Sequence, residues 1–391
     1  MEYELGELLS YKQPTDYIVK STDYDYSYNT PVLTAGKSFI IGYTNEKTGI
    51  FSNLPVIIFD DFTTSSQYVD FPFKVKSSAM KILSCNNKIA DLKYLFYKMQ
   101  TIQFDSSNHK RYWISEYSKI KLELPTLAEQ QRIVNRIESM FAKLDEAKEK
   151  AQNVVDGFET RKAAILHKAF TGELTAKWRK ENGVSDDSWE VKKISDCCVP
   201  RAGYAFDSKK FTTSGFQIIR MGNLYAGELD LSRNPVFYSE SDLDDSIKKR
   251  ALITKGDILI TLTGTKYKHD YGYAVRIDNP NSLLVNQRIL CLTPKSEIKT
   301  NYILYYLHSN MFRNVFFSNE TGGVNQGNVS SKFVESISFI VPTFPEQVEI
   351  VRILDIIIEK ENKAKQAAEA VLEQIDLLKK SILARAFRGE L

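Results

Sequence analysis

The sequence contains few cysteines and histidines, and neither type is placed where it could hold a metal ion. The four cysteines among 391 residues are Cys85, Cys197, Cys198 and Cys291, and no pair has the spacing of zinc ligands. The four histidines are scattered in the same way. We therefore expect no bound metal, and we expect buried thiols in a reducing compartment rather than disulfides.

Long apolar runs are also lacking. No stretch of about 18 apolar residues could span a membrane, and the opening MEYELGELLSYKQ has no basic segment followed by an apolar one, as a signal peptide would. The net charge is only +3, and residues 188–340 alone lean basic, with 19 basic and 15 acidic side chains. The composition predicts a cytoplasmic protein without membrane association, whose nucleic-acid surface, if it has one, is a local patch.

A recognisable set of catalytic residues is the third absence. The Asn-Pro-Pro-Tyr and Asp-Pro-Pro-Tyr signatures of amino-methylating enzymes do not occur. The segment AGKS at 35–38 resembles a phosphate-binding loop, but Pro31 stands where that motif needs a glycine. These absences favour a non-catalytic binding protein.

An internal repeat is the strongest feature that is present. PTLAEQQRIV begins at residue 125 and PTFPEQVEIV at residue 342, while AFTGEL ends at residue 174 and AFRGEL at residue 391. The offset is 217 residues at both ends, and ungapped superposition of 125–174 on 342–391 gives 19 identical residues in 50. Such a match indicates duplication.

Each copy of the repeat is predicted to form one long helix. Apolar residues recur at alternating steps of three and four, which is a heptad seam. Glu361 interrupts the seam of the second copy, where Leu144 stands in the first. A capping box is expected at each start, with Glu129 or Glu346 three residues after a threonine, and Gly172 and Gly389 are expected to end the helices.

The helices alternate with two globular segments, which we call head 1 (residues 1–123) and head 2 (residues 189–340). FIIGYT at 39–44 and PVIIF at 55–59 favour strands, and DLKYLFYKMQ at 91–100 favours a helix. The expected domains are head 1, a spacer helix at 124–175, a polar linker at 176–188, head 2, and a second spacer helix at 341–391. If the two seams pack together, the helices are antiparallel. The predicted fold is α+β: two α/β heads separated by an antiparallel coiled coil, with an approximate two-fold internal repeat.

Certain loops of both heads collect side chains that suit phosphates and base edges. In head 1 the candidate DNA contacts are Lys37, Thr63, Thr64, Lys76, Ser77, Ser78, His109, Lys110, Arg111 and Trp113. In head 2 they are Arg201, Tyr204, Arg220, Thr263, Thr265, Lys266, Tyr267, Asn286, Gln287, Arg288, Asn325 and Gln326. Each of these residues could equally belong to an ordinary solvated loop.

The whole chain resembles the specificity subunit of type I restriction-modification systems. The resemblance is carried by LPTLAEQQRIV…AFTGEL and VPTFPEQVEIV…AFRGEL, by TAGKSFIIGYTNEKTGI, PVIIFDDFTT and HKRYWIS in head 1, and by GDILITLTGT, VNQRIL and GGVNQGNVS in head 2. It implies that each head reads one half of a split, asymmetric DNA target from the major groove. The helices then act as a ruler and as docking sites for methyltransferase subunits.

The resemblance also implies a set of partners. Double-stranded DNA, two methyltransferase subunits and, through them, restriction subunits are expected, while S-adenosylmethionine, ATP and Mg²⁺ belong to those partners. The residues predicted to contact partner subunits lie at the helix starts: Glu129, Gln130, Glu346 and Gln347. The alternatives are a coiled-coil scaffold with protein-binding heads, a nuclease or methyltransferase acting alone, and a specificity subunit of a methylation-only defence system.

Overall fold

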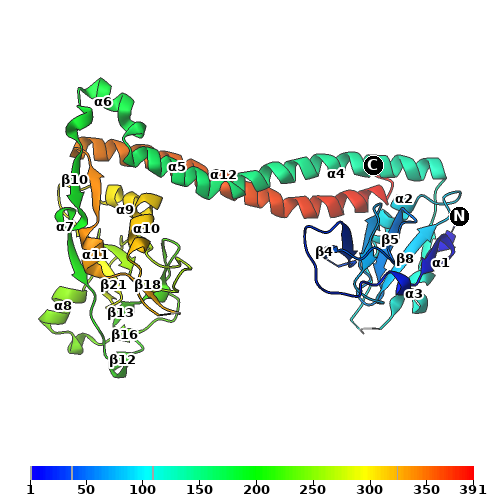
Figure 1. The fold of residues 1–391 in the computed structure, drawn as a ribbon, viewed down its shortest axis with the longest axis horizontal. Helices are drawn as coiled ribbons and strands as arrows, with labels where there is room; N and C mark the ends of the chain where they lie inside the picture. The colour runs from blue at the N-terminus through cyan, green and yellow to red at the C-terminus, as the bar shows by residue number, and fades with distance from the viewer. Residues whose placement is uncertain (1, 37, 108–109, 324) are drawn as a thin grey trace. The chain divides into compact units, whose positions relative to one another are not determined.

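The computed structural model describes residues 2–36, 38–107, 110–323 and 325–391, and the chain divides into two compact units (Figure 1). Unit 1 comprises residues 1–153 and 367–391, and unit 2 comprises residues 154–366. In the described ranges, no helix combines the length and the apolar character needed to cross a bilayer. Each unit combines one head with a pair of helices, so the predicted mixture of helix and sheet is confirmed.

Head 1 is built around a four-stranded antiparallel sheet in the order β2-β8-β5-β6. The strands are β2 (Leu9–Lys12), β8 (Met80–Cys85), β5 (Val56–Asp60) and β6 (Ser66–Val69). A second sheet joins β4 (Ile40–Thr44), β3 (Thr30–Leu33) and β7 (Lys74–Val75), and a two-stranded sheet joins β1 (Glu2–Glu4) to β9 (Lys121–Glu123). Its helices are α1 (Leu5–Leu8), α2 (Leu92–Met99) and α3 (Tyr112–Ser115). The apolar run at 56–59 is buried because β5 is a central strand.

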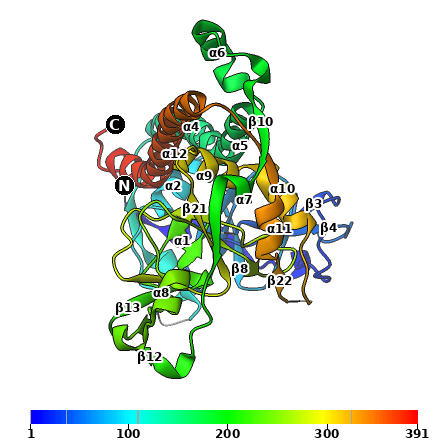
Figure 2. The same ribbon diagram turned by 90° about the vertical axis from the view of Figure 1, so that its left-hand side faces the viewer.

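Head 2, whose α7, β13 and β21 are labelled in Figure 2, repeats this arrangement, and its main sheet has the order β11-β21-β17-β19. The strands are β11 (Cys198–Ala202), β21 (Ile289–Pro294), β17 (Ile258–Thr261) and β19 (Ala274–Arg276). A second sheet orders β12 (Phe211–Thr212), β16 (Phe237–Tyr238), β13 (Phe216–Ile219) and β20 (Leu283–Val285), and β10 (Glu190–Lys193) pairs with β23 (Ser338–Val341). The helices include α7 (Ile194–Cys197), α8 (Asp245–Ala251), α9 (Thr300–His308), α10 (Asn310–Ser318) and α11 (Ser331–Ser336). The shared strand order indicates that the duplication includes the heads.

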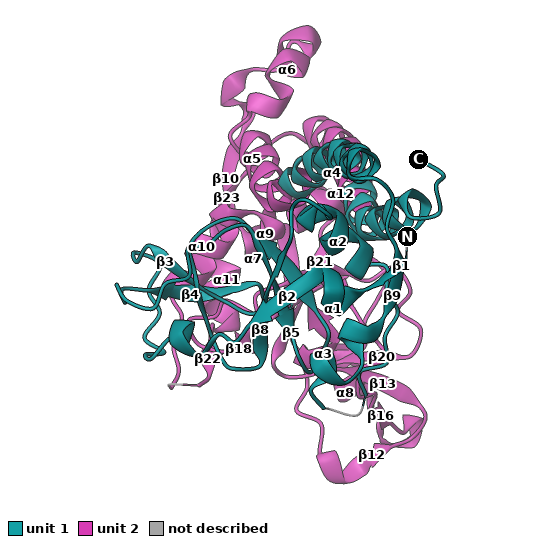
Figure 3. Ribbon diagram, turned by 90° about the vertical axis from the view of Figure 1, so that its right-hand side faces the viewer, with its two compact units in different colours: residues 1–153, 367–391 teal, residues 154–366 magenta. Residues whose placement is uncertain are grey.

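The first copy of the repeat does not form the single helix that was predicted. It forms α4 (Leu127–Asp156) and α5 (Phe158–Phe170), which are separated at Gly157, whereas the second copy forms the continuous α12 (Phe344–Ala386). Gly157 corresponds to Gln374 in α12, and glycine is the poorer helix former by up to about 1 kcal/mol. The C-terminal part of α12 belongs to unit 1 and the N-terminal part to unit 2 (Figure 3).

Within each unit, α12 pairs with a helix of the first copy. In unit 1, Ile137 packs with Leu383 and Ala386, and the Lys379 ammonium lies 2.5 Å from the Asp145 carboxylate, so the two helices run antiparallel. In unit 2, the Arg161 guanidinium donates to the Glu361 carboxylate at 2.7 Å. The charge that interrupts the heptad seam is therefore neutralised within the helix pair.

A buried glutamine fastens the start of α4 to head 1. Gln130 is fully buried; its side-chain carbonyl accepts a hydrogen bond from the Asp91 N–H at 2.8 Å. Its amide group donates to the carbonyl oxygens of Pro125 at 2.9 Å and Ile89 at 3.3 Å. Because Asp91 is the N-cap of α2, this one side chain joins the long helix to the head's own helix. Its burial contradicts the predicted contact with a partner subunit.

The corresponding glutamine of the second copy does the same in unit 2. Gln347 is 1% exposed, accepts from the Lys299 N–H at 2.9 Å, and donates to the carbonyl oxygens of Pro342 at 3.0 Å and Glu297 at 3.3 Å. Lys299 is the N-cap of α9. The prediction that Gln347 contacts a partner is therefore also wrong.

Each head also contacts the C-terminal end of the long helix that belongs to the other copy of the repeat. Phe387, directly after α12, packs edge-on against Tyr94 of head 1 with ring centroids 5.2 Å apart. Phe170 at the end of α5 packs against Tyr302 of head 2 at 5.3 Å. Phe170 and Phe387 are equivalent in the repeat, so both heads use the same aromatic contact.

The segment predicted to be a polar linker is part of unit 2 and is bonded to the start of α12. It contains α6 (Ala176–Asn182), whose Arg179 is 7% exposed and donates to the fully buried Glu346 carboxylate at 2.7 Å. The Thr175 hydroxyl and the Trp189 ring N–H donate to the same carboxylate at 2.6 and 2.8 Å. Glu346 therefore neither closes a capping box nor faces a partner. The equivalent Glu129 is half-exposed and pairs with Arg132, so its predicted partner contact stays a prediction.

We expect Gln347→Ala to lower the free energy of unfolding of unit 2 by about 1–3 kcal/mol, because it leaves the Lys299 N–H and two carbonyl groups without their partner. Thermal or urea unfolding of the full chain measures the loss. Gln131→Ala, an exposed glutamine on α4, is the matched control and should leave stability nearly unchanged. Equal effects of the two substitutions would contradict the role assigned to the buried amide.

Candidate nucleic-acid interface

Three of the predicted DNA loops of head 1 meet at Asp61, the residue directly after β5. The Asp61 N–H donates to the Ala79 carbonyl at 2.9 Å, and its own carbonyl accepts from the Tyr112 N–H at 2.8 Å. Its carboxylate accepts from the Trp113 N–H at 2.8 Å and lies 3.3 Å from the Lys81 ammonium. The described parts of the predicted loops at 60–66, 74–81 and 109–113 are therefore fixed against one another by a single residue.

The first of these loops is a tight turn shaped by Asp60. One Asp60 carboxylate oxygen accepts from the N–H groups of Phe62 and Thr63, at 2.9 and 3.0 Å, and the Asp60 carbonyl accepts from the Thr64 N–H. Thr64 has φ of +59°, a left-handed conformation that β-branched residues rarely adopt. Strain of this kind is held in place by surrounding bonds and is often found at binding sites.

Arg111 presents its side chain beside this turn. It is exposed, and its guanidinium lies over the ring of Phe62 at 5.9 Å from the centroid. The neighbouring Lys110 is also exposed, and its hydrogen bond with Glu116 raises the pKa of the Lys110 ammonium, so this lysine stays charged. A cation stacked on an aromatic ring next to a strained turn is suited to contacts with a phosphate or a base edge.

The remaining predictions for head 1 divide into three groups. Trp113 is 2% exposed and packs against Phe59 and Tyr117, so the predicted DNA contact of its side chain is wrong. Lys37 and His109 lie outside the described residues. Exposed or half-exposed side chains in the loops are Thr63, Thr64, Lys76, Ser77 and Ser78.

Head 2 brings its predicted loops together in the same way, at Leu262. The Leu262 N–H donates to the Arg288 carbonyl at 3.0 Å, and its carbonyl accepts from the Val329 N–H at 2.9 Å. Short strands β18 (Thr263–Gly264) and β22 (Gly327–Asn328) continue this pairing. The segments at 261–267, 285–288 and 325–329 therefore form one cluster.

The loop after β18 is held by two acids that the sequence did not single out. Asp270 accepts from the Thr265 N–H at 2.7 Å; burial would raise the pKa of Asp270, but hydrogen bonds, chiefly from Thr265, together with the nearby Lys268 charge lower it overall. Glu320 accepts from the buried Tyr271 hydroxyl at 2.9 Å. Between these anchors Tyr267 is 76% exposed with φ of +65°. The sequence pattern that could have identified Asp270 and Glu320 is an acidic residue after a strand or within a glycine-rich loop.

Two of the predicted contacts in head 2 make interactions within the head. Thr263 is 7% exposed and its hydroxyl contacts the Met221 sulfur, so it cannot reach DNA without rearrangement. The half-buried Arg201 guanidinium donates to the fully buried Asp257 carboxylate at 2.6 Å, which gives this arginine a structural role, and its predicted DNA contact stays a prediction. The exposed or half-exposed candidates are Tyr204, Arg220, Thr265, Lys266, Tyr267, Asn286, Gln287, Arg288, Asn325 and Gln326.

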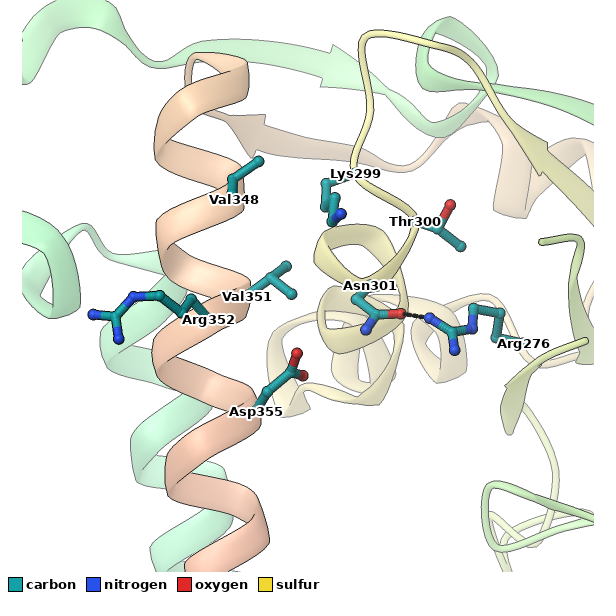
Figure 4. A pocket seen from close by; sticks show the side chains of 8 residues that line it. All are labelled: Arg276, Lys299, Thr300, Asn301, Val348, Val351, Arg352 and Asp355. Carbon is teal, nitrogen blue, oxygen red and sulfur yellow. Dashed lines mark hydrogen bonds between the residues drawn. The ribbon is translucent and has the colours of Figure 1, made fainter. Parts of the chain in front are cut away.

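Unit 2 also contains a hollow of about 410 Å³ where α9 begins beside α12 (Figure 4). Arg276 donates to the Asn301 side chain there, Asp355 accepts from the Tyr305 hydroxyl at 2.5 Å, and Arg352 pairs with Glu349. None of the lining residues belongs to the predicted DNA loops: Arg276, Lys299, Thr300, Asn301, Val348, Val351, Arg352 and Asp355. Among the described residues, no cluster of His, Cys, Asp or Glu could hold a metal ion.

Comparison with known proteins identifies the family. The profile of the "Type I restriction modification DNA specificity domain" matches residues 1–155 and 186–374, and so covers most of both heads and both helices. The chain belongs to the type I restriction-modification DNA specificity family. The function of this family is recognition of the DNA target of a type I restriction-modification system. The predicted family and its main function are therefore confirmed.

Individual relatives agree with this assignment over nearly the whole chain. The chain is 32% identical over 369 residues to the Escherichia coli type I restriction enzyme EcoR124I/EcoR124II specificity subunit, covering 90% of this chain and 85% of that protein. It is 27% identical to the MjaVIII specificity subunit of Methanocaldococcus jannaschii, covering 99% and 92%. The solved HsdS subunit of Thermoanaerobacter tengcongensis has the same fold, with a TM-score of 0.62, 17% identity, and coverage of 100% and 97%.

We expect Arg111→Ala to weaken DNA binding by about 1–3 kcal/mol with a loss of discrimination at one base pair if the guanidinium reads a base edge. If it contacts phosphate alone, the loss should be uniform across sequences and the salt slope should fall by about one. Titration of cognate and singly substituted DNA at two salt concentrations separates the two cases. Lys47→Ala, which removes an exposed charge elsewhere in head 1, is the control. Unchanged binding by folded Arg111→Ala would exclude this loop from the interface.

Proposed function

We propose that head 1 and head 2 each read one half of a split DNA target, with the exposed loop residues around Asp61 and Leu262 as the reading surfaces. The observation that carries this proposal is the equivalence of the two clusters: in each head, the residue after a central strand joins three polar loops through matching backbone hydrogen bonds. Different side chains on a shared frame suit two heads that read different sequences.

Partner subunits complete the proposed activity. Members of this family are specificity subunits, and we propose that this chain supplies no catalytic residue and acts with two methyltransferase subunits and, through them, with restriction subunits. S-adenosylmethionine, ATP and Mg²⁺ would then be bound by those subunits. With Gln130, Glu346 and Gln347 buried, the exposed faces of α4 and α12 are the better candidates for docking them.

Replacement of residues 189–340 by the second head of another specificity subunit should change one half of the methylated motif and leave the other half unchanged. The reason is that the side chains of each loop cluster come from one head alone. Sequencing the methylated motif in a host that carries the partner methyltransferase measures the outcome. A change in both halves, or in neither, would refute the assignment of one half-site to each head.

A second experiment tests the helices as a ruler. Seven residues inserted after Ala147 and seven inserted after Gln374 lie opposite each other in the helix pair of unit 1 and preserve its heptad register. The pair should lengthen by about 10 Å, so the spacer between half-sites should grow by about three base pairs. Insertion into α4 alone is the control and should disrupt the pairing. Altered half-site bases with an unchanged spacer would contradict the ruler.

A further inference from the structure

Head 1 and head 2 differ in how the first turn of a short helix is capped. Each has a short helix that follows a predicted DNA loop and must satisfy the free N–H groups of its first turn. In head 2 that helix is α11, and the side chain of its own N-cap residue, Ser330, accepts from the Phe333 N–H. In head 1 the helix is α3, and its N-cap residue is Arg111, which makes no capping hydrogen bond.

The cap of α3 comes from a residue far away in the sequence. The buried Asp61 carboxylate accepts from the Trp113 N–H at 2.8 Å, so it does for α3 what Ser330 does for α11. Serine, threonine, aspartate and asparagine are the usual N-cap residues because a short side-chain oxygen can reach the helix N–H groups. A remote cap removes that requirement, and the N-cap position becomes available to an arginine.

Strand register shows that Asp61 stands at the position of an apolar residue in head 2. Asp60 pairs with Met80 at the end of β5, as Thr261 pairs with Ile289 at the end of β17. Asp61 is thus equivalent to Leu262, and by the same register Lys81 is equivalent to Leu290.

Both side chains of the charged pair are 1% exposed, and Leu262 and Leu290 are also buried. A buried ion pair is often no more stabilising than an apolar pair of similar size. Stability alone therefore does not account for Asp61 and Lys81.

We propose that Asp61 is a positioning residue for target recognition: its carboxylate fixes the first turn of α3, and through it Arg111, against the strained turn at 60–64. Lys81 neutralises the buried carboxylate, and its ammonium also lies 5.1 Å from the centroid of the Tyr11 ring. This inference rests on the proposed role of head 1 in reading one half-site. The accuracy with which head 1 recognises its half-site then depends on Asp61, a buried side chain that does not contact DNA.

Two double variants isolate the cap from the charge. Asp61→Asn/Lys81→Met removes both charges and keeps a side-chain oxygen for the Trp113 N–H, whereas Asp61→Leu/Lys81→Met removes both charges and the oxygen. Lys74→Met is the control, because Lys74 is equally buried in head 1 and pairs with Glu46 at 3.0 Å, but its bonds go to Glu46, Thr48 and Gly49 and not to Asp61 or α3. The full chain is assembled with its methyltransferase partner and titrated with DNA that carries single substitutions in each half-site.

The leucine variant should lose about tenfold in discrimination at the base pairs affected by Arg111→Ala, and only in that half-site. Adding Arg111→Ala to it should cause no further loss, because the arginine is already misplaced. The asparagine variant and Lys74→Met should discriminate as the parent does. If the leucine variant does not fold by circular dichroism, Asp61→Ala/Lys81→Met replaces it, with the same expectation.

Parental discrimination by the leucine variant, or equal losses in both half-sites, would overturn the positioning role. Equal losses in the leucine and asparagine variants would assign the effect to the charge rather than to the cap, and would also overturn it. Arg288→Ala in head 2 separates this inference from the proposed function, since it should relax only the other half-site. If neither Arg111→Ala nor Arg288→Ala changes discrimination, the reading surfaces themselves are wrong, and the role of Asp61 fails with them.

Discussion

The attachment of each head to helices from both copies of the repeat is the constraint on which the rest of the structure depends. Gln130 and Gln347 join each head to the start of its own helix, and Phe387 and Phe170 join it to the end of the other copy's helix. Neither helix can therefore leave its partner without also losing a head contact. This double attachment explains why the identities in the repeat concentrate at its two ends, where buried polar and aromatic groups have few acceptable replacements.

Two buried carboxylates of unit 2 each join several other residues through hydrogen bonds. Glu346 gathers Thr175, Arg179 and Trp189, and Asp257 gathers Arg201, Thr254 and Thr293. Each carboxylate accepts several hydrogen bonds, which offsets the cost of removing it from water. These bonds help to fix unit 2, from which the polar loops of head 2 project.

The two heads show how one frame can carry different loops. Their main sheets have the same strand order, and the residue after the central strand makes the same two backbone bonds in both. Backbone hydrogen bonds do not depend on the side chain, so Asp61 and Leu262 can occupy this place equally well. The side chains at this place can therefore differ between the heads, and head 1 has the charged pair Asp61–Lys81 where head 2 has two leucines.

The repeat, the alternation of heads and helices, the central strands and the family could be predicted from the sequence, because periodicity and duplicated motifs are local signals that survive in a single chain. The direction in which each polar side chain points could not. Trp113, Thr263, Gln130 and Gln347 look like contact residues in the sequence, and only tertiary packing turns them inward. The role of Asp61 could not be predicted from the sequence either. Its partners Ala79, Lys81 and Trp113 are 18 to 52 residues away, and no local sequence pattern indicates a hydrogen bond across such a separation.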